Sequence, residues 1–188
     1  MKHFFDIGGN KGQTFDWLRT LSNDYRDHIF WIFEPSPRHH EQLIKKCSEM
    51  SEKYNIKLCP FGIGGATGTK LFYEKDDLLG DSFETYIATD HEVHNIKQGY
   101  DVISAIISLP EFILQYTNIN DEIILDIDAE GSEFAILESL IKNQDALIRV
   151  KKIIVEFHYI NNPERFMTRE QIALEIKKAN IDLTIRGF

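Results

Sequence analysis

Two acidic residues at the ends of apolar runs are the first groups in this chain whose positions point to chemistry. Asp6 follows the apolar run "HFF" and opens the glycine-rich stretch "DIGGNKG", and Glu34 follows "HIFWIF". A carboxylate repels a pyrophosphate and attracts an ammonium group. A carboxylate at the end of the following strand can accept hydrogen bonds from both hydroxyls of a ribose. The pair therefore predicts a ligand that carries an ammonium group and a ribose.

The spacing of the glycines argues against two common nucleotide-binding loops. A phosphate-binding loop of the form GxxxxGK[ST] is absent. The dinucleotide fingerprint GxGxxG, started at Gly8, would need glycines where the chain has Asn10 and Gln13, which disfavours a nicotinamide-dependent dehydrogenase. Gly8 and Gly12 would instead let the backbone approach a ligand and let the next helix pack on the sheet. S-adenosylmethionine fits this pattern, because it joins an amino acid to an adenosine through a sulfonium; the alternative is that both carboxylates only cap strand ends.

A second group of ionisable residues follows two later apolar runs. Asp126, Asp128 and Glu130 lie in "ILDIDAEGSE", and Glu156 and His158 lie in "IIVEFHY". Such groups on buried strands are costly to desolvate unless they bind a ligand or one another. We expect His158 or Glu156 to act as a general base towards a hydroxyl. Asp128 and Glu130 would orient the acceptor or hold a divalent metal such as Mg²⁺; the alternative is a hydrogen-bonded network without a catalytic role.

Apolar runs alternate with amphipathic segments along the whole chain. The apolar runs predict strands at 3–7, 28–35, 121–131, 150–159 and 181–188, and at 56–65 a strand that runs into a glycine loop. A short strand is expected from 101 and an extra one at 69–74. The apolar periodicity predicts helices at 14–21, 37–54, from about 108, at 132–141 and at 168–179. Ser108 and Thr168 are the expected N-caps. Strands without polar alternation are buried on both faces, so we predict an α/β fold: a doubly wound, mostly parallel sheet in a three-layer sandwich.

Composition limits the classes of partner. The chain has 188 residues, 43% of them hydrophobic, and no linker-like segment, which predicts one domain over 1–188. A formal charge of -9 with scattered basic residues disfavours nucleic acid. No apolar run is long enough to span a membrane and no signal peptide precedes the first strand, so we expect a cytoplasmic protein. Cys47 and Cys59 do not have the spacing of metal-binding or redox-active cysteines and are expected to be free buried thiols. His39 and His40 lie at the start of a predicted helix and are expected to be solvated.

Five pieces of this chain, in order, resemble the FkbM family of S-adenosylmethionine-dependent methyltransferases. They are "FDIGGNKGQT", "FEPSP", "FGIGGATGTKLFY", "ILDIDAEGSEFAILESL" and "IIVEFHY", between residues 4 and 159. The resemblance implies a class I methyltransferase (Rossmann-like) fold and transfer of a methyl group to a hydroxyl, often on a sugar or polyketide. The predicted cofactor-binding residues are Asp6, Gly8, Asn10, Gly12, Glu34, Pro35, Gly62 and Asp126.

The chain departs from the family pattern at three places. Asp126 replaces a common lysine, few residues precede the first motif, and "IDLTIRGF" supplies a sixth strand but hardly a seventh. The acceptor pocket would then be open, or completed by an oligomer partner or a neighbouring domain. Ser82, His91 and His94 lie in the irregular segment 67–98 and are candidate contacts to a small-molecule or glycan acceptor. The alternatives to a sugar O-methyltransferase are an N- or carboxyl-methyltransferase on a small metabolite or protein, and an inactive cofactor-binding module.

Overall fold

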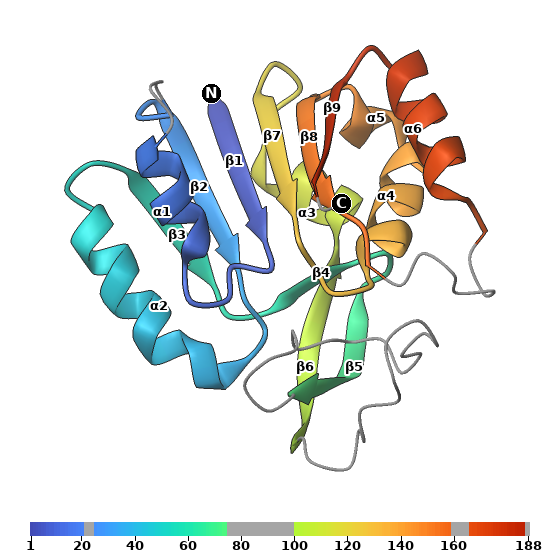
Figure 1. The fold of residues 1–188 in the computed structure, drawn as a ribbon. Coiled ribbons are helices and arrows are strands. Elements are labelled where there is room, and N and C mark those ends of the chain that lie inside the picture. The colour runs from blue at the N-terminus through green and yellow to red at the C-terminus, as the bar shows by residue number, and fades with distance from the viewer. Residues whose placement is uncertain (21–24, 75–99, 159–165, 187–188) are drawn as a thin grey trace.

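Six parallel strands form the central sheet of the protein. The computed structural model describes residues 1–20, 25–74, 100–158 and 166–186 (Figure 1). The strand order is β3-β2-β1-β7-β8-β9. The strands are β1 (Lys2–Ile7), β2 (His28–Phe33), β3 (Asn55–Cys59), β7 (Glu122–Ile127), β8 (Val150–Glu156) and β9 (Asp182–Arg186). The order reverses at β1, so the predicted doubly wound α/β sheet, with its sixth strand, is confirmed.

Helices cover both faces of this sheet. On one face lie α1 (Gln13–Thr20) and α2 (Pro37–Met50); on the other lie α3 (Leu109–Tyr116), α4 (Glu133–Lys142), α5 (Gln144–Leu147) and α6 (Arg169–Lys178). Phe4 packs in the first core and its neighbour Phe5 in the second, and both are fully buried. Successive side chains of a strand point to opposite faces, so burial on both sides explains the unbroken apolar runs. Each described helix is too short or too polar to cross a membrane.

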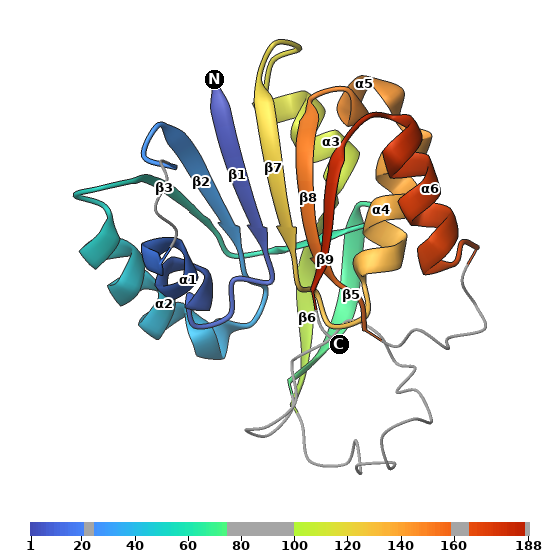
Figure 2. The same ribbon diagram turned by 45° about the horizontal axis from the view of Figure 1, so that its top comes forward.

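A smaller sheet lies beyond the carboxyl ends of β1, β2 and β7 (Figures 1 and 2). It contains β4 (Gly62–Gly64), β5 (Gly68–Glu74) and β6 (Tyr100–Ser108) in the order β4-β6-β5, with β4 parallel and β5 antiparallel to β6. The extra strand predicted at 69–74 is thus confirmed as β5. The segment 56–65 was predicted as a strand that runs into a glycine loop. The strand is confirmed as β3, but Gly62–Gly64 forms a second strand, β4, so the segment divides into two strands. Pro60 stands at the division, where it cannot donate a ladder hydrogen bond.

The helix boundaries follow local capping chemistry. The Ser108 side chain accepts a hydrogen bond from the backbone N–H of Glu111, and Thr168 forms a capping box with Gln171, so both predicted N-caps are confirmed. Helix α2 ends at Met50, four residues before the predicted end, and α5 was not predicted. A four-residue helix is too short to show an apolar period.

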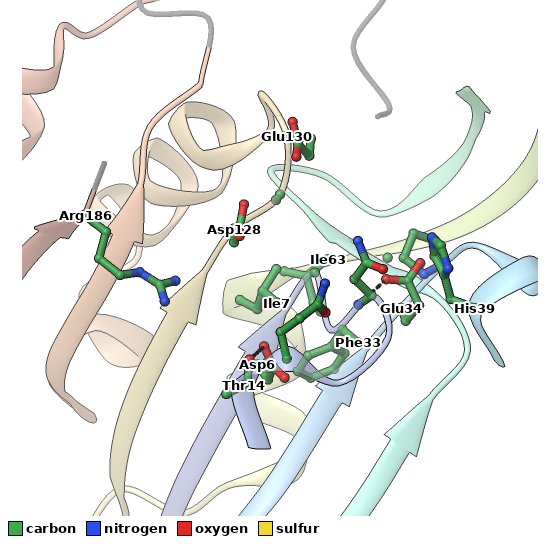
Figure 3. Close-up of a pocket in the computed structure, with 16 residues that line it drawn as sticks. Asp6, Ile7, Thr14, Phe33, Glu34, His39, Ile63, Asp128, Glu130 and Arg186 are labelled. Atoms are coloured by element: carbon green, nitrogen blue, oxygen red, sulfur yellow. Dashed lines mark hydrogen bonds between the residues drawn. The ribbon is translucent and has the colours of Figure 1, made fainter. Parts of the chain in front are cut away.

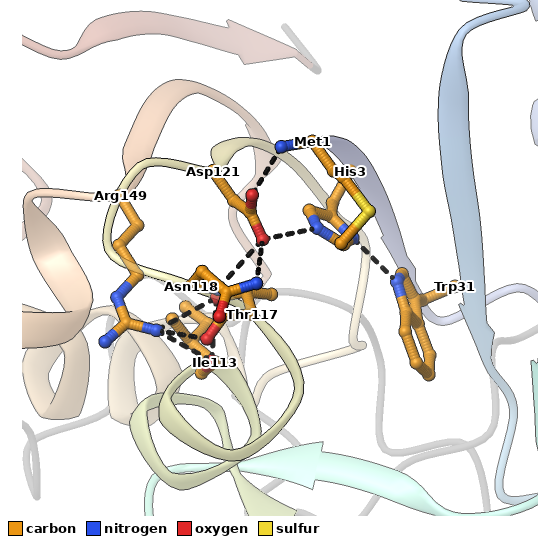
Figure 4. Close-up of polar contacts among 8 residues, drawn as sticks. All are labelled: Met1, His3, Trp31, Ile113, Thr117, Asn118, Asp121 and Arg149. Atoms are coloured by element: carbon orange, nitrogen blue, oxygen red, sulfur yellow. Dashed lines mark hydrogen bonds and ion pairs between the residues drawn. The ribbon is translucent and has the colours of Figure 1, made fainter.

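A buried polar network joins the amino ends of β1 and β7 (Figure 4). The Trp31 indole N–H donates to Nδ1 of His3 at 3.1 Å, and Nε2 of His3 lies 3.1 Å from Oδ2 of Asp121. An indole nitrogen only donates, so Nδ1 accepts and Nε2 carries the hydrogen donated to Asp121. The Asn118 backbone N–H (2.8 Å) and the Met1 ammonium also donate to Asp121. Burial acts to raise the pKa of Asp121, but these hydrogen bonds outweigh it and lower that pKa below its ordinary value.

We predict that Asp121→Asn lowers the free energy of unfolding by about 1–3 kcal/mol at pH 7, because it weakens hydrogen bonds to a buried carboxylate. A carboxyl with a lowered folded-state pKa stabilises fully above its unfolded pKa of about 3.9, and this contribution disappears as pH falls through the folded value. Urea unfolding should therefore show a difference between variant and wild type that shrinks below about pH 4. Asp182→Asn, which alters an exposed ion pair with Lys152, is the control and should change stability little. Equal effects of both substitutions would contradict the prediction.

Candidate active site

A cavity of about 300 Å³ opens at the carboxyl ends of β1, β2 and β7, the edge where ligands bind in doubly wound sheets (Figure 3). The loop after β1, the end of β2, the start of β4 and the loop after β7 contribute to its wall. Glu34 and His39 lie on one side of it, and Asp128 and Arg186 lie on the other. Its volume is at the lower end of the range for small-ligand sites.

Six of the eight predicted cofactor residues line this cavity: Asp6, Gly8, Asn10, Glu34, Pro35 and Gly62. Gly12 is not among the lining residues. It has φ +81°, and a Cβ there would lie 3.0 Å from the Lys46 side chain and 3.3 Å from that of Leu43. Gly12 therefore lets the loop approach α2, which is a packing role rather than the predicted approach to a ligand. Asp126 does not line the cavity either, but it bonds Arg186, which does.

Gly8 brings two loops into backbone contact. Its φ is +95°, and an added Cβ would lie 1.9 Å from the carbonyl oxygen of Asp128 in the loop after β7. Its N–H donates to the Phe33 carbonyl at the end of β2, at 3.1 Å. A side chain at this position would force the loops of three neighbouring strands apart.

Glu34 fixes the glycine loop through its carboxylate. Its Oε2 accepts a hydrogen bond from the Asn10 backbone N–H and its Oε1 accepts one from the Ser36 N–H, each at 2.7 Å. Each carboxylate oxygen has a further lone pair, so the side chain retains acceptor capacity next to the cavity. The expected solvation is wrong for His39, which is buried against the cavity. His40 is half-buried, and its Nε2 lies 2.8 Å from the Glu34 carbonyl oxygen.

Asp6 and Asp126 form a buried acidic pair across β1 and β7. The two residues lie opposite each other on the paired strands, and only 4% of Asp6 and 2% of Asp126 is exposed to solvent. Oδ1 of Asp6 accepts from the Thr14 hydroxyl at 3.0 Å, whereas Oδ2 of each aspartate is buried without a hydrogen-bond partner among the described residues. Burial, and then the Asp126 charge, raises the pKa of Asp6 well above its ordinary value. Burial raises the pKa of Asp126 to about 6, although Arg186 opposes this.

Glu133 organises the loop after β7 and was not singled out from the sequence. Its fully buried carboxylate accepts from the backbone N–H groups of Ala129 (2.9 Å) and Gly131 (3.0 Å), and Nδ1 of His158 lies 2.9 Å away. It thus connects a loop that contains positive φ angles at Glu130 and Gly131 to the end of β8. The only sequence signal was its place in "IDAEGSE", where a carboxylate in the first turn of a helix is an ordinary feature.

The four predicted catalytic residues converge around the His158 ring. Nε2 of His158 lies 3.9 Å from Oδ1 of Asp128, 3.8 Å from Oε2 of Glu130 and 3.9 Å from Oε1 of Glu156. Burial acts to lower the pKa of His158, but the hydrogen bond to Glu133 and the surrounding carboxylates raise it to about 9. The imidazole is therefore protonated at neutral pH, and it must lose a proton before it can act as a base.

The predicted metal ligands are only partly suited to a metal. Ligand atoms of Asp128, Glu133 and His158 lie within 4.8 Å of one another, and Glu130, which was predicted with Asp128, is outside this group. Glu133 already accepts hydrogen bonds from two backbone N–H groups and from His158, which a cation would have to displace. The group does not fit a metal well, and no step below depends on one.

Comparison with known families identifies the fold. A family model described as "Methyltransferase FkbM domain" matches residues 6–181. The chain belongs to this FkbM methyltransferase family. No similar curated protein and no similar solved structure was found. The resemblance, the Rossmann-like fold and the methyltransferase class predicted from sequence are therefore confirmed.

The FkbM domain match covers the glycine loop, Asp6 and Glu34, the ionisable residues around His158, and most of the sheet. Arg186 lies beyond the match, lines the cavity and was not predicted, because nothing in a lone arginine at the end of a strand marks it. Ser82, His91 and His94, the predicted acceptor contacts, lie outside the described residues.

Cys47 and Cys59 are free and buried as predicted, and burial raises their thiol pKa values to about 11 and about 12.

We predict that Gly8→Ala destabilises this FkbM domain by at least about 1–3 kcal/mol, because it adds backbone strain at a positive φ to a collision with Asp128. Thermal unfolding measures the loss. Gly68→Ala is the matched control, since an added Cβ at Gly68 meets nothing within 4 Å. Unfolding midpoints that fall equally in both variants would refute the steric account.

Proposed function

We propose that this FkbM domain is an S-adenosylmethionine-dependent O-methyltransferase that acts on a hydroxyl of a sugar, glycan or related polyol. The observation that carries the proposal is that Asp6 and Glu34, at the carboxyl ends of adjacent strands, line one cavity. Asp6 would receive the ammonium of the cofactor's amino-acid part, and Glu34 the hydroxyls of its ribose. The membership of a methyltransferase family supports this cofactor.

The group around His158 supports a hydroxyl as the acceptor. Methyl transfer is an in-line displacement in which the acceptor oxygen bonds to the methyl carbon, the carbon–sulfur bond breaks, and sulfur keeps the electron pair. The hydroxyl proton must pass to a base, and in our proposal His158 takes it after losing its own proton. Glu133 holds Nδ1 of the ring, so Nε2 is the atom directed towards Asp128 and Glu130, which would orient the hydroxyl.

A cationic cofactor would favour the neutral form of His158. S-adenosylmethionine carries a sulfonium and an ammonium against one carboxylate, so its binding adds net positive charge near the ring and lowers the pKa of the imidazole. The carboxylates around His158 would also attract an amine, which makes an N-methyltransferase the second candidate. Such an acceptor could lose its proton to solvent before the reaction.

We predict that Asp6→Asn weakens binding of S-adenosylhomocysteine by about 10- to 100-fold, because the ammonium loses a charged acceptor. The same change should raise the thermal unfolding midpoint at pH 7.5. The raised pKa of Asp6 means that its ionised form destabilises the folded state above that pKa, and this penalty fades as pH falls. The gain over wild type should therefore be smaller at pH 5. Calorimetry measures binding; wild-type protein that binds neither cofactor nor product would eliminate the proposed activity.

The acceptor class is tested by incubation with methyl-labelled cofactor and a panel of neutral sugars, amino sugars and oligosaccharides. We predict label on a hydroxyl oxygen and a kcat/KM for the acceptor that rises with pH towards an apparent pKa below the value of about 9 of the cofactor-free protein, since the bound cofactor lowers the pKa of His158. His158→Gln should abolish this rise and lower the rate by about 10²- to 10⁴-fold. Label on nitrogen, with a rate unchanged in His158→Gln, would favour the amine acceptor. No transfer to any member despite cofactor binding would favour an inactive module.

A further inference from the structure

The ion pair between Arg186 and Asp126 is made with only one of two possible hydrogen bonds. Nη2 of Arg186 donates to Oδ1 of Asp126. Guanidinium and carboxylate groups commonly form two parallel bonds. Here the second donor, Nε of Arg186, and the second acceptor, Oδ2 of Asp126, are both buried without a partner among the described residues. One donor and one acceptor of this ion pair therefore remain unsatisfied.

A third unsatisfied atom lies next to this pair. Asp126 on β7 is the register partner of Asp6 on β1, and Oδ2 of Asp6 is also buried without a partner in the described part of the chain. Arg186 reaches these strands from β9, where it pairs in register with Glu156 of β8. Both Asp6 and Arg186 line the cavity (Figure 3). The wall of the cavity thus includes one residue with an unsatisfied acceptor, Asp6, and one with an unsatisfied donor, Arg186, and Asp126 bonds Arg186 without lining the cavity.

The combination selects a zwitterion as the ligand. A buried polar group without a partner is unfavourable, so a ligand that pairs Oδ2 of Asp6 and Nε of Arg186 gains this energy on binding. A metal ion or a simple amine would satisfy the aspartates but leave the Arg186 donor unpaired. A phosphate or a carboxylic acid would satisfy Arg186 but would be repelled by the aspartates. An α-amino acid group carries an ammonium and a carboxylate on one carbon, and so it satisfies both sides.

We propose that Arg186, held by Asp126, binds the carboxylate of the cofactor's amino-acid part, while Oδ2 of Asp6 accepts from its ammonium. This rests on the proposed function and adds Arg186 as a binding residue. The last strand of the sheet then contributes directly to cofactor binding, although it is far from the glycine loop in sequence.

Three adenosyl compounds separate the two charges. S-adenosylhomocysteine has both the ammonium and the carboxylate, decarboxylated S-adenosylmethionine has only the ammonium, and 5′-methylthioadenosine has neither. By calorimetry on the full chain, Arg186→Gln should weaken S-adenosylhomocysteine by about 10- to 100-fold and change the other two by less than about twofold. Asp6→Asn should weaken the first two compounds and spare 5′-methylthioadenosine. Lys152→Gln, which removes a cation from neighbouring β8, is the matched control and should change none.

A purely structural role of Arg186 would give a different pattern. If Arg186→Gln weakens all three compounds equally, or leaves S-adenosylhomocysteine unchanged, the proposal is wrong. Arg186→Lys keeps the charge and the contact to Asp126 but loses the planar fork, and it provides the second test if the glutamine variant unfolds. It should weaken S-adenosylhomocysteine selectively, by about 3- to 10-fold. Wild-type protein that binds none of the three compounds would instead overturn the proposed function itself.

Discussion

The in-register pairing of β1 with β7 is the constraint on which the site depends, because it places the carboxylates of Asp6 and Asp126 side by side in a buried setting. Neighbouring strands are about 4.8 Å apart, and two like charges at that distance repel by about 3 kcal/mol at an effective dielectric constant of 20. The fold offsets only part of this, through Thr14 and Arg186. The apolar cores on both faces of the sheet must supply the rest, so the stability of the sheet maintains an acidic pair that is unfavourable without a cation.

Two other carboxylates, Glu34 and Glu133, fix loops through hydrogen bonds from backbone N–H groups, and in our proposal Glu34 receives the ribose in addition. Glu34 accepts from the backbone N–H groups of Asn10 and Ser36. Glu133 does the same for the loop after β7 and also holds the His158 ring. Backbone donors that are already paired do not need to reorganise when a ligand arrives, which lowers the entropy lost on binding. The site therefore combines rigid loops with an unsatisfied charged pair.

The parts of this arrangement that depend on local pattern could be predicted from the sequence. Burial on both faces gives unbroken apolar runs, and the residue at the end of each run then falls at one edge of a parallel sheet; this is why Asp6, Glu34, Asp128 and His158 were found together. Glu133 and Arg186 were missed for a different reason. Glu133 contacts His158, 25 residues later in the sequence, and Arg186 contacts Asp126, 60 residues earlier. No periodicity of the sequence encodes contacts between residues so far apart in the chain. The burial of His39 likewise depends on tertiary packing.

The charge balance of the cavity also bears on turnover. With the proposed cofactor bound, the sulfonium lies in a site where carboxylates outnumber the cationic groups among the described lining residues. Methyl transfer converts the sulfonium into a neutral thioether, and the proton from the acceptor hydroxyl passes to the base. The attraction that favours the charged cofactor is thereby weakened in the product, while the interactions with the ammonium and the carboxylate persist. A site that gained its affinity from the zwitterion alone would hold cofactor and product equally. In our proposal, the acidic pair and the cluster around His158 would shift the balance towards the reactive, positively charged form.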